Sequence, residues 1–173
     1  MNQFSIRPLS ISDANRMIEW MHNEEVTRYL KLHGATASFE DAISFIENAK
    51  DESANIHRAI VDQNDIYLGT VSLKNIDLIK KEAEYAIAMH PDGIGTGASK
   101  AGTELILKLA FEDLKLNRIY LNVLSDNVRA VKFYYKLGFV LYDKTKISFK
   151  GKEKVLLWFE KIKQQNPDNS TCC

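Results

Sequence analysis

Two closely spaced glycines, Gly95 and Gly97, stand where an alternating strand pattern over residues 84–90 gives way to a helical pattern over residues 100–114. Backbone N–H groups at the start of a helix have no partner within the helix, and the helix dipole adds partial positive charge there. Glycine lets the chain turn tightly and lets an oxyanion approach the backbone. The junction therefore indicates an anion site suited to phosphate, although such glycines can also serve a turn alone.

Two common phosphate-binding loops do not fit this junction. A dinucleotide (Rossmann) loop needs a third glycine near position 100, where Lys100 stands, and an acidic residue about 20 residues later. The acid that follows the next predicted strand, Asp126, comes too late. A Walker loop ends in glycine, lysine and then serine or threonine, and this ending is absent. The spacing therefore disfavours both classes.

A second motif follows a predicted strand over residues 117–124 and runs from Asn127 to Phe139. It resembles the pattern Asn-x-x-Ala-x-x-x-Tyr-x-Lys-x-Gly-Phe of the GNAT superfamily, the acetyl-CoA-dependent N-acetyltransferases. Every fixed position of that pattern is matched here, by Asn127, Ala130, Tyr134, Lys136, Gly138 and Phe139.

The glycine junction matches the same superfamily less completely. The family's loop has glutamine or arginine, then glycine, then glycine or alanine, and these positions are occupied by Ile94, Gly97 and Ser99. Only the central glycine is kept. The resemblance extends more weakly over residues 4–162, and it is nearest to the branch that includes acetyltransferases of ribosomal-protein N-termini.

The resemblance implies acetyl-CoA as cofactor and acetyl donor. In the family, the strand before the glycine loop pairs with the pantetheine amides, and N–H groups of the loop hold the pyrophosphate. Ser99 and Lys100 depart from the family's usual residues, which leaves Lys100 either as a phosphate ligand or as a solvent-exposed side chain. The implied cofactor-binding residues are Ile87, Ala88, Met89, Ile94, Gly95, Thr96, Gly97, Ala98, Ser99, Lys100, Asn127 and Tyr134.

Acetyl transfer to an amine requires a base, because an alkyl ammonium has no lone pair with which to attack. Glu84 is the first candidate, since it stands in the strand that would carry the cofactor and shares a face with Ala86 and Ala88. A glutamate facing water at a strand end is the alternative. Glu82 is the second candidate and His57 the third.

The departing thiolate needs a proton, and Tyr134 matches the family's tyrosine that supplies it. A phenol with a reference pKa of about 10 is a proton donor throughout the neutral range. Tyr134 also falls on an apolar helical stripe, so a core aromatic is the alternative. Its neighbour Tyr135 is the residue from which it must be distinguished. Asn127 is a residue type that caps helices, and the resemblance adds a hydrogen bond to the cofactor.

In the superfamily the acceptor is chosen by the first two helices with their connection and by the final hairpin, here residues 20–34 and 142–152. Trp20, Glu24 and Tyr29 are candidate substrate-binding residues, and the alternative places the aromatics in the core and the acid on the surface. The substrate is expected to be a small-molecule or peptide amine. A peptide N-terminus, a polyamine, an aminoglycoside and an amino-sugar nucleotide all remain open.

Composition narrows the partners and the compartment. The 173 residues hold 23 basic and 23 acidic side chains, so no basic surface predicts a nucleic-acid partner. No apolar run reaches membrane-spanning length and no signal peptide is recognisable, which predicts a cytoplasmic protein, as a monomer or homodimer. The adjacent Cys172 and Cys173 suit neither a disulfide nor a tetrahedral metal site, and no metal is expected.

The order of elements predicts an α+β fold with a GNAT-like mixed, mostly antiparallel, seven-stranded sheet flanked by about four helices. Residues 1–162 are expected to form a single acetyltransferase domain, and residues 163–173 a polar, disordered tail. The leading hypothesis is direct attack of the amine on acetyl-CoA in a ternary complex, since no cysteine lies outside the tail to carry an acetyl group. The alternative is a catalytically impaired CoA-binding sensor or assembly module.

Overall fold

One sheet of seven strands runs through the whole molecule, in the order β1-β2-β3-β4-β5-β7-β6. The structure is a computed structural model and describes residues 3–30 and 36–164. The strands are β1 (Phe4–Pro8), β2 (Ile56–Asp62), β3 (Tyr67–Asp77), β4 (Glu82–Met89), β5 (Arg118–Leu124), β6 (Val140–Phe149) and β7 (Lys152–Ile162).

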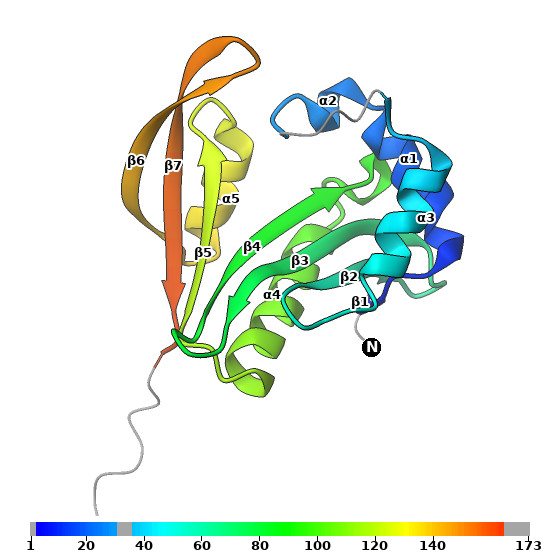
Figure 1. Ribbon diagram of the computed structural model, residues 1–173, viewed down its shortest axis with the longest axis horizontal. Helices are drawn as coiled ribbons and strands as arrows, with labels where there is room; N and C mark the ends of the chain where they lie inside the picture. The colour runs from blue at the N-terminus through cyan, green and yellow to red at the C-terminus, as the bar shows by residue number, and fades with distance from the viewer. Residues whose placement is uncertain (1–2, 31–35, 165–173) are drawn as a thin grey trace, which may run out of the picture.

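The sheet divides in the middle because β4 and β5 pair over only three positions, Glu82 with Arg118, Ala83 with Ile119 and Glu84 with Tyr120. This pairing is parallel, whereas every other pair of neighbouring strands in the sheet is antiparallel. Beyond Glu84 the two strands diverge, and Figure 1 shows the V that they form, open at the top. The predicted mixed and mostly antiparallel seven-stranded sheet is therefore confirmed.

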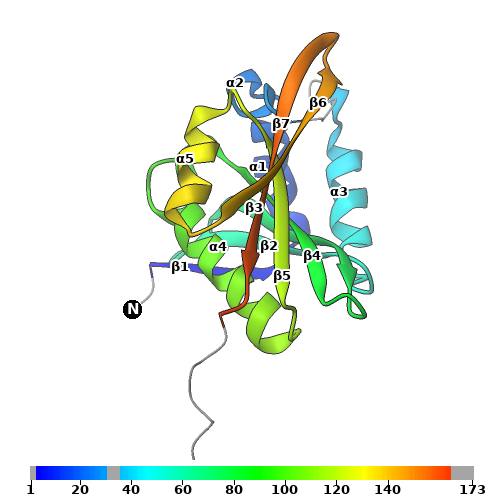
Figure 2. The ribbon, with the colours of Figure 1, turned by 90° about the vertical axis from the view of Figure 1, so that its left-hand side faces the viewer.

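Helices cover both faces of the sheet (Figure 2). On one face, α1 (Ala14–Met21) and α3 (Phe39–Asn48) enclose a core cluster that contains Met17, Ile46 and Val61. On the other face, α4 (Ala98–Lys108) and α5 (Val128–Lys136) enclose the larger cluster. Since alternate strand residues face opposite sides, β4 contributes to both clusters.

Two differences from the predicted elements concern helices. The segment after Met21 contains a short helix, α2 (Glu24–Thr27). Asn23 caps it, because its side chain accepts hydrogen bonds from the N–H groups of Glu25 and Val26. This helix raises the α-helices of the described residues to five. The helix predicted over 100–114 begins at Ala98 and continues past Lys108 as a π-helical turn, Leu109–Asp113.

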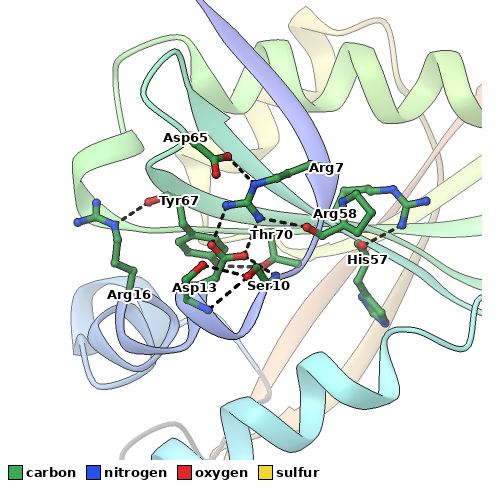
Figure 3. Close-up of polar contacts among 11 residues, drawn as sticks. Arg7, Ser10, Asp13, Arg16, His57, Arg58, Asp65, Tyr67 and Thr70 are labelled. Atoms are coloured by element: carbon green, nitrogen blue, oxygen red, sulfur yellow. Dashed lines mark hydrogen bonds and ion pairs between the residues drawn. The ribbon is translucent and has the colours of Figure 1, made fainter.

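The start of α1 is fixed to the sheet by a nearly buried carboxylate. Both terminal nitrogens of Arg7 bind the two oxygens of Asp13 at 2.9 Å, and Arg7 Nε binds Asp65 at 2.5 Å (Figure 3). Asp13 also accepts the backbone N–H of Ser10, which caps the turn that leads into α1. The Asp13 hydrogen bonds raise the pKa of Arg7 above its ordinary value. This bidentate pair sets the height of α1 above the sheet.

The closed end of the V is held by one arginine. Arg118 binds Glu82 of β4 at 2.9 Å and Glu160 of β7 at 2.6 Å, and its guanidinium lies 5.0 Å from the ring centroids of both Tyr120 and Tyr142. Carboxylates on either side thus fasten β4 and β7 to the start of β5. We refer to Arg118, Glu82 and Glu160 as the vertex clamp.

Some expectations concern residues outside the described part of the chain. Residues 165–173, which contain Cys172 and Cys173, are among them, whereas β7, which ends at Ile162, is described. Across residues 3–30 and 36–164, no helix has the length and apolar character needed to cross a membrane.

A test of this packing is Gly102 of α4, which lies directly against β2. A Cβ atom at this position would stand 2.4 Å from Ile60 Cδ1, and both residues are buried. We expect Gly102→Val to lower the free energy of unfolding by about 1–3 kcal/mol through overpacking. Glu104→Val, an exposed position on the same helix, is the control. Chemical denaturation measures both, and equal effects would show that α4 does not pack closely on Ile60.

Candidate functional site

A cleft of about 990 Å³ occupies the V between β4 and β5. Its walls come from β4, β5, the loop between β4 and α4, the start of α5 and the segment around α2. The sequence places these segments far apart, and the split of the sheet brings them together. The predicted residues that line the cleft are Glu84, Ile87, Ala88, Met89, Ile94, Gly95, Gly97, Ser99, Lys100, Asn127, Tyr134 and Tyr29.

The inner edge of β4 presents backbone groups without strand partners. His90, just after β4, donates its N–H to Leu68 at 2.9 Å, on the β3 side. Successive residues of a strand direct their backbone groups to alternate sides, so Ile87 and Met89 direct theirs toward β5. At this height β4 and β5 are no longer paired. The edge can therefore accept an extended chain that carries amide groups, as the pantetheine arm does.

The loop after β4 forms a concave nest of N–H groups. Gly95 and Gly97 have φ angles of 83° and 95°, in the left-handed region that favours glycine. Thr96 braces the loop, because its hydroxyl donates to the carbonyl of Gly93 at 2.8 Å and accepts the N–H of Ala98 at 3.2 Å. Thr96 and Ala98 do not line the cleft with their neighbours, so their side chains shape the loop. Since the Ala98 N–H is bound by Thr96, the N–H groups of Ser99 and Lys100 at the start of α4 are the ones left for an anion.

Lys100 stands on the outer side of this nest. Its ammonium lies 3.8 Å from Glu104, one helical turn later, and both side chains are mostly exposed. Of the two alternatives for Lys100, the structure shows the solvent-exposed arrangement. Because an exposed pair of this kind is weak, it would not prevent Lys100 from turning toward a phosphate.

A buried histidine ties the loop to α1. His90 is 5% exposed and its Nε2 lies 2.7 Å from Glu19 of α1. Its Nδ1 accepts the backbone N–H of Asp92 at 3.1 Å, and Arg16 of α1 binds Asp92 at 2.8 Å. Since Nδ1 accepts that N–H, Nε2 carries the proton and donates to Glu19. The hydrogen bond from Arg16 lowers the pKa of Asp92.

Tyr134 projects from α5 into the cleft through a wall of aromatic rings. It is 7% exposed and packs edge-on against Tyr85, with ring centroids 6.0 Å apart, and against Phe139 at 5.8 Å. No described residue forms a hydrogen bond with its hydroxyl. In the described part of the chain, every fully buried side-chain oxygen has a hydrogen-bond partner, so this unpartnered hydroxyl is not fully buried. Since Tyr134 lines the cleft, its hydroxyl reaches the cleft space. Burial raises the pKa of Tyr134 above its ordinary value, which keeps the phenol protonated.

The neighbouring tyrosine is placed differently. Tyr135 is 52% exposed and packs edge-on against Phe159 on the outer side of α5. It does not line the cleft. Asn127 caps α5 as its residue type predicts, because its side-chain oxygen accepts the N–H of Ala130 at 3.3 Å.

Glu84 reaches the cleft from the opposite face of β4. Its carboxylate is held at both oxygens: Oε1 accepts from Lys74 at 3.1 Å and from Asn122 of β5 at 3.4 Å, and Oε2 accepts from Asn75 at 3.0 Å. The side chain is 17% exposed. Asn122 could not be identified from the sequence, because its contact with Glu84 depends on the parallel pairing of β4 with β5.

The two lower-ranked base candidates lie away from the cleft. Glu82 is committed to Arg118 in the vertex clamp. His57 Nδ1 lies 2.7 Å from the Ser72 hydroxyl, and its ring packs edge-on against Phe45 with centroids 4.8 Å apart. Burial, then the charges of Lys74 and Arg58, lower the pKa of His57. Neither residue lines the cleft.

The substrate candidates divide into core and cleft. Trp20 is 4% exposed, donates its indole N–H to the Tyr67 hydroxyl at 3.0 Å, and belongs to the core beneath α1. Its proposed place in the pocket was therefore wrong, since helical spacing does not distinguish a core tryptophan from a pocket one. Glu24 is exposed on α2 and does not line the cleft, whereas its neighbour Glu25 does. Tyr29 lines the cleft and donates its hydroxyl to the Asp126 carbonyl at 3.3 Å.

Comparison with known proteins gives relatives over most of the chain. The chain is 28% identical over 134 residues to a spermidine N(1)-acetyltransferase of Escherichia coli, covering 78% of this chain and 71% of that protein. It is 25% identical over 138 residues to the acetyltransferase PseH of Campylobacter jejuni, covering 80% and 83%.

Among solved structures, the spermidine N-acetyltransferase of Vibrio cholerae, in complex with CoA and spermine, superposes with a TM-score of 0.85. The two chains are 23% identical, and the match covers 94% of this chain and 96% of that one, which shows a shared fold. The family model described as Acetyltransferase (GNAT) domain matches residues 3–140. The chain therefore belongs to the GNAT family, whose members transfer an acetyl group from acetyl-CoA.

Proposed function

We propose that the protein transfers the acetyl group of acetyl-CoA to a small-molecule amine by direct attack in a ternary complex, with Tyr134 as the general acid and Glu84 as the base. The observation that carries the proposal is the placement of these two residues. They reach one cleft from opposite faces of the split sheet, beside an unpaired strand edge and a nest of N–H groups. The alternative of an impaired CoA-binding module is disfavoured, because both candidate catalytic groups lie in the cleft.

Each part of the cleft has a role in this proposal. The N–H groups at residues 95–100 hold the pyrophosphate, and Ile87 and Met89 hold the pantetheine amides, which directs the thioester toward the vertex of the V. Glu84 takes a proton from the incoming ammonium, directly or through a water molecule. The free amine adds to the thioester carbonyl, the C–S bond breaks, and the thiolate takes the Tyr134 hydroxyl proton. The nitrogen, which is positively charged after it adds, gives its second proton back to the Tyr134 phenolate, directly or through a water molecule, so that the amide and the thiol both leave neutral.

The relatives indicate the type of reaction more clearly than they indicate which amine is acetylated. Two of them are named for spermidine, which makes a polyamine one candidate acceptor. None of the relatives named above is an acetyltransferase of ribosomal-protein N-termini. The resemblance to that branch of the superfamily therefore rests on the two sequence motifs alone. A peptide N-terminus remains an acceptor to be tested beside small amines.

Removal of the Tyr134 hydroxyl tests the general acid. Tyr134→Phe keeps the ring contacts with Tyr85 and Phe139 and removes only a hydroxyl that no described residue binds. We therefore expect a small change in stability and a fall in kcat of about 10²–10⁴-fold, since this is the usual contribution of general-acid catalysis. Single-turnover rates are the appropriate measurement, because product release can limit kcat. Tyr135→Phe is the control, and equal effects of the two substitutions would contradict the role of Tyr134.

Glu84→Gln tests the base through its pH dependence. The amide keeps the size of the side chain but cannot take a proton, so we expect the rate to fall by about 10²-fold or more at neutral pH. An alkyl amine with a pKa of about 10.4 is increasingly free base as pH rises, so the deficit should shrink above pH 8. A deficit that stays constant with pH would make Glu84 a structural partner of Lys74 instead.

Cofactor binding is tested by thermal unfolding. Acetyl-CoA at 100 times its dissociation constant should stabilise the folded protein by about 2.7 kcal/mol. NADH and ATP also carry phosphates, but they lack an amide chain to pair with the edge at Ile87 and Met89, so they should stabilise it much less. Equal shifts from NADH and acetyl-CoA would contradict the cofactor site.

A further inference from the structure

A second pocket of about 350 Å³ lies at the open end of the V, between the segment after α2 and the β6–β7 hairpin. Its charged lining consists of Arg28, Lys150, Lys152, Lys154 and Asp126, which leaves a formal excess of three positive charges. The whole chain has no such excess of positive charge, because it contains equal numbers of basic and acidic residues. We refer to this feature as the basic pocket.

Most of this positive charge is not neutralised by the protein. Lys154 forms an ion pair with Asp126. Arg28 lies 3.6 Å from Glu25, but both side chains are more than half exposed, so the pair is weak. Lys150 donates to the carbonyl oxygens of Thr27 and Arg28, at 3.5 and 3.3 Å.

The remaining lysine, Lys152, has no partner among the residues that the structure describes. Lys152 is exposed at the start of β7 and makes no ion pair or side-chain hydrogen bond with any described residue. Its charge is the one most available to a ligand in the basic pocket.

The basic pocket is continuous with the acceptor end of the catalytic cleft. Tyr29, Phe149 and Asp126 are among the residues that line both. The rings of Tyr29 and Phe149 stand beside the cations, with Arg28 at 4.7 Å and Lys150 at 5.3 Å from their centroids. No residue of the loop 94–100 lines the basic pocket, so it is separate from the pyrophosphate nest.

Each carboxylate of the catalytic cleft has a cation beside it, although the exposed pair of Glu25 with Arg28 is weak. Those that line it are Glu25, Glu84 and Asp126, and they pair with Arg28, Lys74 and Lys154 respectively. A polyamine enters with at least one further ammonium group beyond the one that reacts. Along the described walls of this cleft that group would find no carboxylate without a cation already beside it, and it would approach the uncompensated charge of the basic pocket.

We infer that the acceptor is an amine that also carries an anionic group, a phosphate or a carboxylate, and that the basic pocket binds this group, with Lys152 as the main specificity determinant. The inference rests on the proposed acetyl transfer, since it names the acceptor of that same site. The aromatic walls contact the part of the acceptor between its amine and its anion. A phosphate matches the excess charge more fully than a carboxylate does.

A series of amines of matched length separates these chemistries. Binding to the CoA-saturated protein is measured by calorimetry for 5-aminopentyl phosphate, 6-aminohexanoate, 5-aminopentanol, 1,5-diaminopentane and spermidine. We expect the phosphate to bind about tenfold or more tightly than the diamine, with the alcohol between them. The difference should shrink at high salt. A diamine or spermidine that binds as tightly as the phosphate, or a series with no measurable binding, would overturn the inference.

Charge reversal locates the effect. Lys152→Glu should weaken binding of the phosphate by about tenfold or more, while CoA binding stays unchanged. Lys144→Glu is the control, because Lys144 is also exposed on the same hairpin but does not line either cavity. Equal effects of the two substitutions would assign the preference to general surface charge and overturn the basic pocket.

The same series keeps the inference distinct from the proposed function. Thiol release from acetyl-CoA is measured in parallel with every amine. Turnover without any preference for an anionic amine would support acetyl transfer and refute the basic pocket. Binding of the phosphate that depends on Lys152, without turnover of any amine, would support the basic pocket and refute the proposed catalysis.

Discussion

The architecture depends on where β4 stops pairing with β5. Three residue pairs hold the two halves of the sheet together, and the vertex clamp reinforces them, because Arg118 binds a carboxylate from each half. If the strands stayed paired along their length, the inner edge of β4 would be satisfied and the cleft would not exist. If they did not pair at all, Asn122 could not reach Glu84. A short parallel ladder, held at its end by the ion pairs of Arg118, keeps the two halves of the sheet together and leaves the cleft open.

The divided sheet also explains why the two proposed catalytic groups lie in different environments. Tyr134 belongs to the larger core beneath α4 and α5, where burial raises its pKa and rings fix its orientation. Glu84 lies on the other face of β4, surrounded by nitrogen donors from β3 and β5. One wall of the cleft therefore supplies a protonated acid and the other a fixed carboxylate.

Much of this could be predicted from the sequence, because it depends on local chemistry. Alternation located β4, Gly95 and Gly97 located the loop, and Asn127 located the start of α5. The position of Trp20 could not be predicted, since the apolar stripe of α1 is the same for a core residue and for a pocket residue. The basic pocket could not be found either. Its lysines and Arg28 come from segments that meet only across the open end of the V, and nothing in the spacing of single charges reports that meeting.

The unpaired edge of β4 has a consequence for the behaviour of the protein in solution. Exposed strand edges are templates on which other chains can add, and this leads to aggregation. The edge at Ile87 and Met89 is recessed, and the mouth of the V is bridged by the Tyr29 hydrogen bond to Asp126 and by Lys150 across to Thr27. A foreign β-strand cannot lie along this edge without breaking those bridges, whereas a thin linear molecule can enter end first. The recessed edge therefore resists strand addition by other copies of the protein and remains accessible to a narrow ligand.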